Sequence, residues 1–264
     1  MATLVGVIRF VGSIKGIRNF KKLHDPKIYA SEKGFIGKKL YKTSPKFKNN
    51  RLSNGEFGGC SLAVKGIRKG LLQVIPEMVD AAVTERLMKF TRLLSLRDED
   101  HEKGKRSICF SQYRSFMSTL ELNKNHKVYD ATMSAIRGSH SDSRTATTIE
   151  VTGLKMPFRV IPPGATHYRI LSHMSVVSDY YYSENFRKYG PINSLDRLSA
   201  FAYSDIVELG GVLTAKISIA FPEGTVLGDD CSVIHCLAIE FMEPNGAAGY
   251  RPIHGASLEM IDVF

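Results

Sequence analysis

The sequence predicts an α+β protein with three consecutive parts: an N-terminal arm of short strands, a helical hairpin and a C-terminal antiparallel β-sandwich. Two observations carry this prediction. Apolar residues recur every three or four positions through residues 55–96, as in helices. From about residue 108 they fall in short alternating runs separated by turn signals. We expect the parts to span residues 1–54, 55–106 and 107–264.

The N-terminal part is predicted to be a basic β arm that continues into a loop. In residues 3–31 apolar side chains alternate roughly with polar or small ones, and Asp25-Pro26 forms a turn between short segments. Residues 32–54 lack hydrophobic periodicity and are rich in lysine and asparagine. We expect this stretch to be an extended loop that a partner orders.

A first helix is predicted from about residue 55, with Ser53 or Asn54 as its N-cap and Glu56 in its first turn. An apolar stripe at alternating spacings of three and four residues should face the core. Its members are Phe57, Cys60, Val64, Ile67 and Leu71.

A second stripe on this helix consists of small residues. Each glycine inside a helix costs up to about 1 kcal/mol relative to alanine, so glycines at helical spacing predict close approach by another element, in this chain or a neighbouring copy. An ordinary helix softened by glycine is the alternative. The stripe comprises Gly59, Ala63, Gly66 and Gly70, and a third face carries Lys65, Arg68 and Lys69.

A second helix is predicted to begin near Pro76, because proline suits the first turn of a helix. Glu85 and Lys89 stand four residues apart in the favourable order for an ion pair. The two helices should form a hairpin, which the charged stretch 97–106 links to the next part. The predicted buried stripe consists of Val79, Val83, Leu87, Phe90 and Leu94.

The C-terminal part is predicted to be a sandwich, because its strands are separated by the turn signals "IPPG", "PEGT" and "EPNG" and no long helix intervenes. The segment "CSVIHCLAIEF" is apolar on both faces and should be the central strand. Cys231 and Cys236 lie five positions apart, which places them on opposite faces of a strand. This separation argues against a disulfide between them. All four cysteines, including Cys60 and Cys109, are expected to be buried free thiols.

Charge is distributed unevenly along the chain. The formal net charge is +10; residues 1–50 carry 12 Lys/Arg and 2 Asp/Glu, whereas residues 201–264 carry 2 Lys/Arg and 9 Asp/Glu. This polarity is what a subunit needs if its basic end meets the acidic end of a neighbour, while a nucleic-acid binder needs no acidic end. Uneven charge without functional meaning is the simpler alternative.

Two stretches are candidates for contacts with partners. The tract at residues 38–51 interleaves rings with lysines; it can dock on an acidic protein surface, contact phosphates while its rings stack on bases, or be a solvated loop. No helix-turn-helix, RRM or zinc-finger pattern accompanies it. In "SDYYYSENFRKYG", at least one of Tyr180, Tyr181 and Tyr182 should face outward, where tyrosine favours interfaces; rings lying over a sandwich edge are the alternative.

No catalytic, metal-binding or cofactor-binding residues are expected, because no P-loop, G-x-G-x-x-G, H-E-x-x-H or G-x-S-x-G motif is present. Ser139, His140 and Asp142 are interpreted as a polar surface turn, and Asp229-Asp230 as a charged strand entrance. Cys231 and His235 share a strand face, but a metal site would need further ligands. His254 is interpreted as a loop histidine.

Both ends of the chain resemble an uncharacterised Bacteroidota protein family. "GVIRFVG" followed by "NFK" resembles its opening "G-x-I-x-x-x-G…F-Y-K", and "SEKG" resembles its "KKGG" turn. Phe47, Arg51, Asn54 and the segment "EFG" at 56–58 resemble its "F-x-x-x-R-x-N-x-x-E-F-G" signature, with a small departure in spacing. The ending "LAIEFMEPNGAAGYRP" is also similar. The resemblance implies a cytoplasmic bacterial protein and assigns no activity.

We therefore predict a non-enzymatic structural subunit that assembles with copies of itself into a filament, tube or shell. A nucleic-acid-binding or packaging protein and an enzyme or ligand binder of another type are the alternatives. No membrane partner is expected, because no run approaches the length of a membrane span. The expected assembly interface comprises Lys38, Lys39, Tyr41, Lys42, Lys46, Phe47, Lys48, Gly59, Ala63, Gly66, Gly70, Tyr180, Tyr181, Tyr182, Asp229 and Asp230; the nucleic-acid contacts would be Lys38, Tyr41, Lys46, Phe47 and Arg51.

Overall fold

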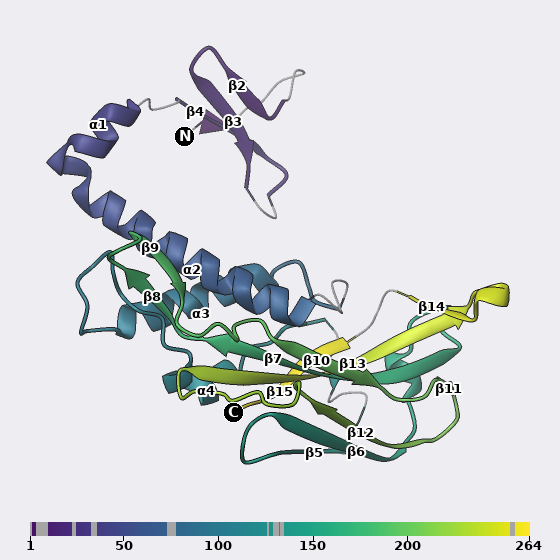
Figure 1. Ribbon diagram of the computed structural model, residues 1–264. Coiled ribbons are helices and arrows are strands. Elements are labelled where there is room, and N and C mark those ends of the chain that lie inside the picture. Colours follow the sequence, from purple (N-terminus) through teal and green to yellow (C-terminus); the bar gives the residue numbers. More distant parts are fainter. Residues whose placement is uncertain are drawn as a thin grey trace. The chain divides into compact units, whose positions relative to one another are not determined.

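The chain folds into the α+β structure that the sequence predicts, with helices mostly before residue 120 and antiparallel sheets mostly after it (Figure 1). It divides into two compact units, Met1–Arg51 and Leu52–Phe264. The computed structural model describes residues 2–3, 10–22, 25–32, 36–72, 78–125, 127–128, 132, 135–253 and 257–264.

The first unit contains a small antiparallel sheet with the strand order β1-β4-β3-β2. The hairpin between β2 and β3 turns at Lys15 and Gly16, which both have positive φ angles (45° and 84°), as a two-residue type I′ turn requires. The elements of this unit are β1 (Ala2–Thr3), β2 (Gly12–Ile14), β3 (Ile17–Lys21), β4 (Ile28–Glu32), α1 (Lys38–Thr43) and η1 (Pro45–Phe47).

The prediction that residues 32–54 form an extended loop is wrong, because most of that stretch is helical. After α1 and η1, helix α2 begins at Lys48 and continues to Leu72, so Ser53 and Asn54 lie inside it and do not cap it. The Arg51 guanidinium donates hydrogen bonds to the carbonyls of Tyr41 (2.6 Å) and Ser44 (2.9 Å). The first bond satisfies an acceptor near the end of α1. The second adds to a bond that the Ser44 carbonyl already accepts from the backbone N–H of Phe47 (3.2 Å).

The second unit has three layers: a helix pair, a six-stranded sheet and a three-stranded sheet. The large sheet has the order β10-β7-β13-β14, with β11 also on β7 and β15 also on β13; the small one has the order β12-β6-β5, and β8 and β9 form a separate hairpin. The strands are β5 (Ile136–His140), β6 (Ala146–Leu154), β7 (His167–Ser178), β8 (Tyr180–Ser183), β9 (Lys188–Pro191), β10 (Ser199–Tyr203), β11 (Val207–Glu208), β12 (Leu213–Ala220), β13 (Cys231–Pro244), β14 (Tyr250–Pro252) and β15 (Ser257–Val263).

Strand β13 is the central strand of the large sheet, as its sequence predicts. It pairs with β7 along twelve residues, and every residue from Cys231 to Met242 is buried. Leu237 and Ile239 pack against the three-stranded sheet, whereas Cys236 and Ala238 pack against the helices. The predicted free cysteines are confirmed, and Cys231 and Cys236 do face opposite sides; Cys109 is only partly buried.

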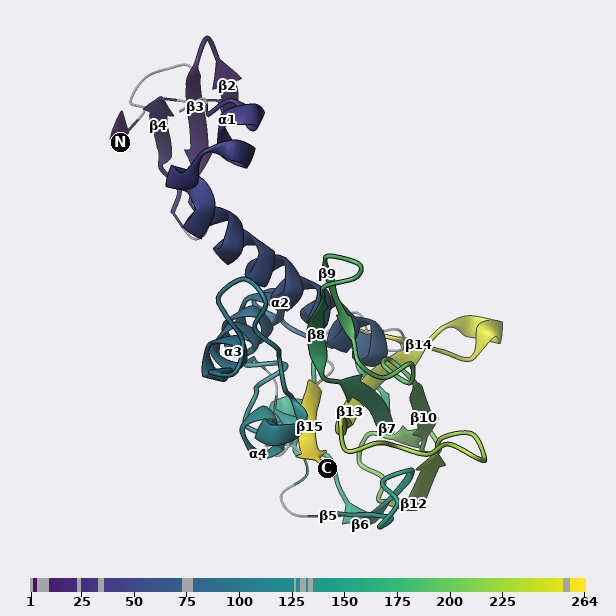
Figure 2. The same ribbon diagram turned by 60° about the vertical axis from the view of Figure 1, so that its left-hand side comes forward.

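Helices α2 and α3 (Val83–Arg97) lie side by side over one face of the large sheet, as Figures 1 and 2 both show. Short elements, η2 (Ser111–Tyr113) and α4 (Arg114–Met117), follow them. The predicted stripe of Val83, Leu87, Phe90 and Leu94 is buried, and Glu85 forms the expected ion pair with Lys89 (3.0 Å). The helix begins at Val83, after Val79; Pro76 lies outside the described residues.

Phe57 is not part of the buried stripe, contrary to the prediction, because its side chain is 58% exposed. Glu56 occupies the inner face of α2 instead. Its carboxylate accepts hydrogen bonds from the Arg92 guanidinium (2.7 Å) and from the backbone N–H of Gly104 (2.9 Å). These bonds hold the pKa of Glu56 below its usual value, although burial acts in the opposite direction. Because its charge is paired, the Glu56 carboxylate can be buried on the face of α2 where the apolar pattern predicts the Phe57 ring.

The small-residue stripe of α2 meets strands of the same chain. A Cβ atom at Gly59 would lie 2.6 Å from the ring of Tyr189, and one at Gly66 would collide with the hydroxyl of Tyr180. This hydroxyl donates a hydrogen bond to Asp196 (2.7 Å), which fixes the ring. Two small residues complete the stripe: Ala63 is fully buried, and a Cβ at Gly70 would collide with Ser175.

Alanine substitutions along α2 should separate the covered face from the exposed one. Gly59→Ala and Gly66→Ala should each lower the free energy of unfolding by about 1–3 kcal/mol, because rigid rings must move. Gly58→Ala is the matched control: nothing lies within 4 Å of its added Cβ, so it should raise stability by up to about 1 kcal/mol. Urea denaturation measures all three; equal effects at the three positions would contradict this packing.

Candidate functional site

The basic tract of the first unit forms an exposed helical surface. The rings of Tyr41 and Phe47 contact each other, with centroids 5.6 Å apart, and both are partly buried. Leu40 is 56% exposed beside them. All five lysines predicted for this surface are exposed and form no ion pair among the described residues of their unit: Lys38, Lys39, Lys42, Lys46 and Lys48.

Arg51 differs from these lysines, because its guanidinium is already engaged. It binds the carbonyls of Tyr41 and Ser44, so a nucleic-acid contact by Arg51 would compete with bonds that join α1 to the start of α2. The free cations of the tract are therefore lysines alone. Lysine binds an anion as a point charge and lacks the planar fork by which arginine matches phosphate or carboxylate geometry.

A groove with a volume of about 610 Å³ lies between α2 and α3, on the side turned away from the sheet. We call it the α2–α3 groove. Buried Val64 and partly buried Met88 line its base, and exposed Phe57 stands at its rim. The other residues that line it are Ser61, Thr84 and three exposed cations, Lys65, Arg68 and Lys69.

The three cations of the α2–α3 groove lack the ion pairs that neighbouring charges have. On the same helix pair, Arg92 binds Glu56 at 2.7 Å and Lys89 binds Glu85 at 3.0 Å. No ion pair joins Lys65, Arg68 or Lys69 to any described acidic residue. An apolar groove beside uncompensated positive charge is suited to an anionic ligand that also has an apolar part.

Residues 222–230, which connect β12 to β13, form a second distinctive surface that we call the acidic loop. Two arginines hold its backbone: Arg144 donates to the carbonyl of Gly228 (2.9 Å), and Arg114 donates to that of Asp229 (3.3 Å). Both also donate to the carbonyl of Cys231, each at 2.7 Å. Burial lowers the pKa of Arg114, and the neighbouring charge of Arg144 lowers it further.

Several side chains of the acidic loop are exposed to solvent. Val226 is 80% exposed, and Glu223 and Asp229 are exposed on either side of it in sequence. Neither carboxylate forms an ion pair with a described residue. Asp230 is partly buried and accepts a hydrogen bond from the Asn193 amide (3.3 Å). The predicted strand entrance is thus a clamped loop with an apolar tip and exposed carboxylates, and the charge of Arg114 lies close enough to interact with that of Asp229.

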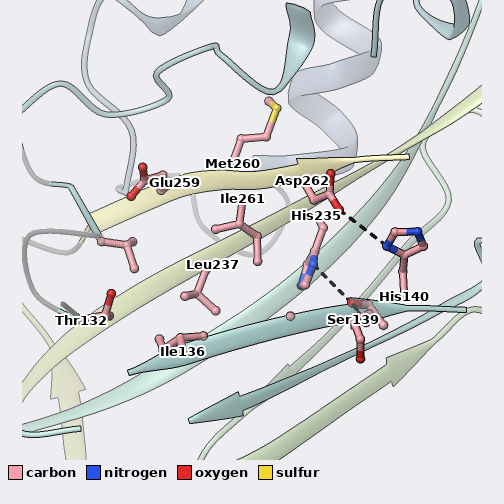
Figure 3. A pocket seen from close by; sticks show the side chains of 13 residues that line it. Thr132, Ile136, Ser139, His140, His235, Leu237, Glu259, Met260, Ile261 and Asp262 are labelled. Carbon is pink, nitrogen blue, oxygen red and sulfur yellow. Dashed lines mark hydrogen bonds and ion pairs between the residues drawn. The ribbon is translucent and has the colours of Figure 1, made fainter. Parts of the chain in front are cut away.

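A cavity of about 460 Å³ opens between the edges of the two sheets, at β5 and β15 (Figure 3). His235 of β13 lies at its inner end, and His140 and Asp262 face each other at 3.6 Å. The His140 ring also stacks on Phe264, with centroids 4.1 Å apart. Ser139 and Asp142 are exposed, and the stretch interpreted as a polar surface turn comprises the end of β5 and the turn that follows it.

His235 is poorly suited to act as a base in this cavity. Its Nε2 atom lies 2.9 Å from the Ser172 hydroxyl and its Nδ1 atom 3.3 Å from the Thr147 hydroxyl, so both nitrogens are engaged. Burial lowers the pKa of His235 to about 4. In the part of the chain that the structure describes, no three His, Cys, Asp or Glu side chains are placed to hold a metal ion. His254 lies outside the described residues.

Only one tyrosine of the predicted interface strand is well exposed. Tyr180 is buried against α2, and Tyr182 packs on Tyr189 with centroids 5.4 Å apart. Tyr181 is 42% exposed, which confirms the prediction that at least one ring faces outward. Other residues of the same chain cover both Tyr180 and the small-residue stripe. A neighbouring copy therefore cannot contact them, contrary to the predicted interface.

Comparisons with protein families, with proteins of assigned function and with solved structures found no match to this chain. The resemblance of its two ends to a bacterial family therefore stays a prediction. None of the described helices is long and apolar enough to cross a membrane. The two charged, partly apolar surfaces of the second unit and the lysines of the first are the surfaces best suited to bind a partner.

Acid should destabilise the fold through two buried histidines. Burial lowers the pKa values of His173 and His235 to about 4 from 6.5, so the unfolded chain binds more protons between these pH values. Stability should therefore fall as pH falls from 6.5 to 4, by about 2 kcal/mol per histidine at pH 5. Urea denaturation at several pH values should show that His235→Gln flattens this dependence.

Proposed function

We propose that this protein is a non-enzymatic structural subunit that assembles with copies of itself through oppositely charged surfaces. One observation supports this most directly: the second unit carries both halves of a contact that it does not make internally. The cations of the α2–α3 groove and the carboxylates of the acidic loop have no ion-pair partner among the described residues. Each set lies beside exposed apolar side chains, Phe57 and Val226.

Oppositely charged surfaces on different parts of one subunit favour a head-to-tail contact. Such a contact builds a ring if its rotation closes and an open filament if it does not. Exposed ion pairs contribute only about 0–1 kcal/mol each, so charge alone would give weak assembly. The apolar side chains next to the charges supply the remaining attraction, and charge determines which surfaces meet.

The lysine surface formed by residues 38–48 extends the same proposal to the first unit. Its five exposed lysines and the half-exposed Leu40 form a second basic surface with an apolar component. In this proposal it meets acidic residues of a neighbouring copy, such as Asp205 and Glu208. A cytoplasmic, bacterial setting is part of the proposal and rests on the sequence alone.

Nucleic-acid binding is the second candidate function. It is favoured by the composition of residues 38–51, which contain five lysines and one arginine and no acidic residue. Lysines in this number can neutralise several phosphates and would give a steep dependence of affinity on salt. The partly buried, mutually packed rings of Tyr41 and Phe47 are less available for stacking on bases than the sequence suggests.

Assembly should be sensitive to salt. Size-exclusion chromatography with light scattering should show particles larger than a monomer at about 20 mM salt and dissociation toward the monomer at about 500 mM, because ions screen the charged contacts. Lys46→Glu with Lys48→Glu should weaken assembly. Lys155→Glu with Lys188→Glu makes the same change of charge at exposed positions of the other unit and should have little effect.

A wild-type monomer at every salt concentration would contradict the proposal. The same variants test the second candidate with a single-stranded DNA probe. If Lys46→Glu with Lys48→Glu assembles normally but binds this DNA more weakly and with a smaller salt dependence, nucleic-acid binding is the better description.

A further inference from the structure

We infer that two copies join when the acidic loop of one docks in the α2–α3 groove of the next. This inference rests on the proposed function and names the surfaces that make its contact. The groove and the loop belong to the same unit, so each copy carries one receptor and one ligand.

The groove has the chemistry of a receptor for an acidic segment with an apolar tip. Its base is apolar, at Val64 and Met88, and Phe57 adds a large exposed ring at the rim. Lys65, Arg68 and Lys69 lie on consecutive turns of α2 along the same groove. A ligand that buried the apolar base would bring its own charges next to these three cations.

The acidic loop has the complementary chemistry. Val226 is 80% exposed, and the carboxylates of Glu223 and Asp229 lie three positions to either side in sequence. The partial desolvation of these carboxylates in a contact would be offset by the unpaired cations of the groove. Surfaces that match in both charge and apolar character favour one docking orientation over others.

The loop is also held in place before it binds. The two arginine clamps fix the carbonyls of Gly228, Asp229 and Cys231, and the Thr225 hydroxyl donates to the carbonyl of Pro222 (2.6 Å). Leu227 packs against the core beneath the loop. A loop that is already ordered loses little conformational entropy on docking, so more of the contact energy appears as affinity.

The arrangement of the layers makes this contact heterologous. The groove is on the helix layer, on one face of the large sheet, whereas the loop follows β12 of the small sheet, which packs on the opposite face (Figure 1). A copy bound through its loop therefore leaves its own groove open for a third copy. Repetition of this single contact produces a chain or a ring of subunits.

Charge reversal in complementary pairs tests the contact. The groove variant carries Lys65→Glu, Arg68→Glu and Lys69→Glu; the loop variant carries Glu223→Lys and Asp229→Lys. Each alone should need at least about tenfold more protein to assemble, because attraction is lost and repulsion is gained. An equimolar mixture should assemble again, since the loop of the groove variant fits the groove of the loop variant and the reversed surfaces also match each other.

Matched controls accompany these variants. Arg137→Glu, Lys155→Glu and Lys188→Glu make the same change of charge at exposed positions outside the groove and should leave assembly intact. Val226→Ser tests the apolar tip without changing charge and should also weaken assembly. Val212→Ser, at a valine that is 60% exposed elsewhere, should not. Thermal denaturation verifies that each variant is folded. If a charge-reversal variant does not fold, the effect of Val226→Ser on assembly tests the contact in its place.

Three results would overturn the inference. The groove variant and Val226→Ser could assemble like wild type; the mixture of reversed variants could fail to assemble; or the groove variant could lose only binding to single-stranded DNA or to anionic lipid vesicles. In each case wild-type assembly would leave the proposed function standing with a different interface. A wild-type protein that never assembles would instead remove the proposed function itself.

Discussion

The burial of strand β13 on both faces is the constraint on which the rest of the second unit depends. Successive side chains of a strand point to opposite faces, and those from Cys231 to Met242 are all shielded from water. One cover would therefore leave half of an apolar strand exposed. The helix pair covers one face and the three-stranded sheet covers the other, and the separate apolar clusters on the two sides reflect this division.

The helix cover can lie close to the sheet because α2 presents small residues to it. Glycines at positions 59, 66 and 70 leave room for Tyr189, Tyr180 and Ser175. The rotation of α2 that brings these glycines inward also buries Glu56, which Arg92 neutralises, and turns Phe57 outward. The apolar rim of the α2–α3 groove is thus a consequence of how the helix meets the sheet. The side of the helix pair left facing outward is then both apolar and basic.

Features that depend on local periodicity could be predicted from the sequence. The α+β class, the central place of β13 and the buried stripe of α3 are of this kind. Helix α1 could not be predicted, because it buries no side chain and so has no apolar stripe. The burial of the Glu56 side chain could not be predicted from the sequence for a different reason. Its partner Arg92 lies 36 positions away, and without that partner a buried carboxylate would be costly.

For the candidate assembly surfaces, the sequence predicts only which charges are in excess at each end of the chain, not where they gather in the fold. Excess base near the start of the chain and excess acid near its end indicated charged surfaces, and the lysines of α1 and Asp229 are exposed as expected. For the groove cations at 65, 68 and 69, the sequence predicts only that they share a third face of the helix. The clamp on the acidic loop depends on Arg114 and Arg144, which lie far from it in sequence, so no local pattern could have revealed it.

The arginine clamp also determines which parts of the acidic loop are free to diverge. Arg114 and Arg144 bind main-chain carbonyls of the loop, and every residue type offers the same carbonyl. Side chains at the tip can therefore be exchanged while the backbone keeps its path. In the proposed contact, related chains that shared this clamp would present different tips on the same backbone, each matched to its own groove.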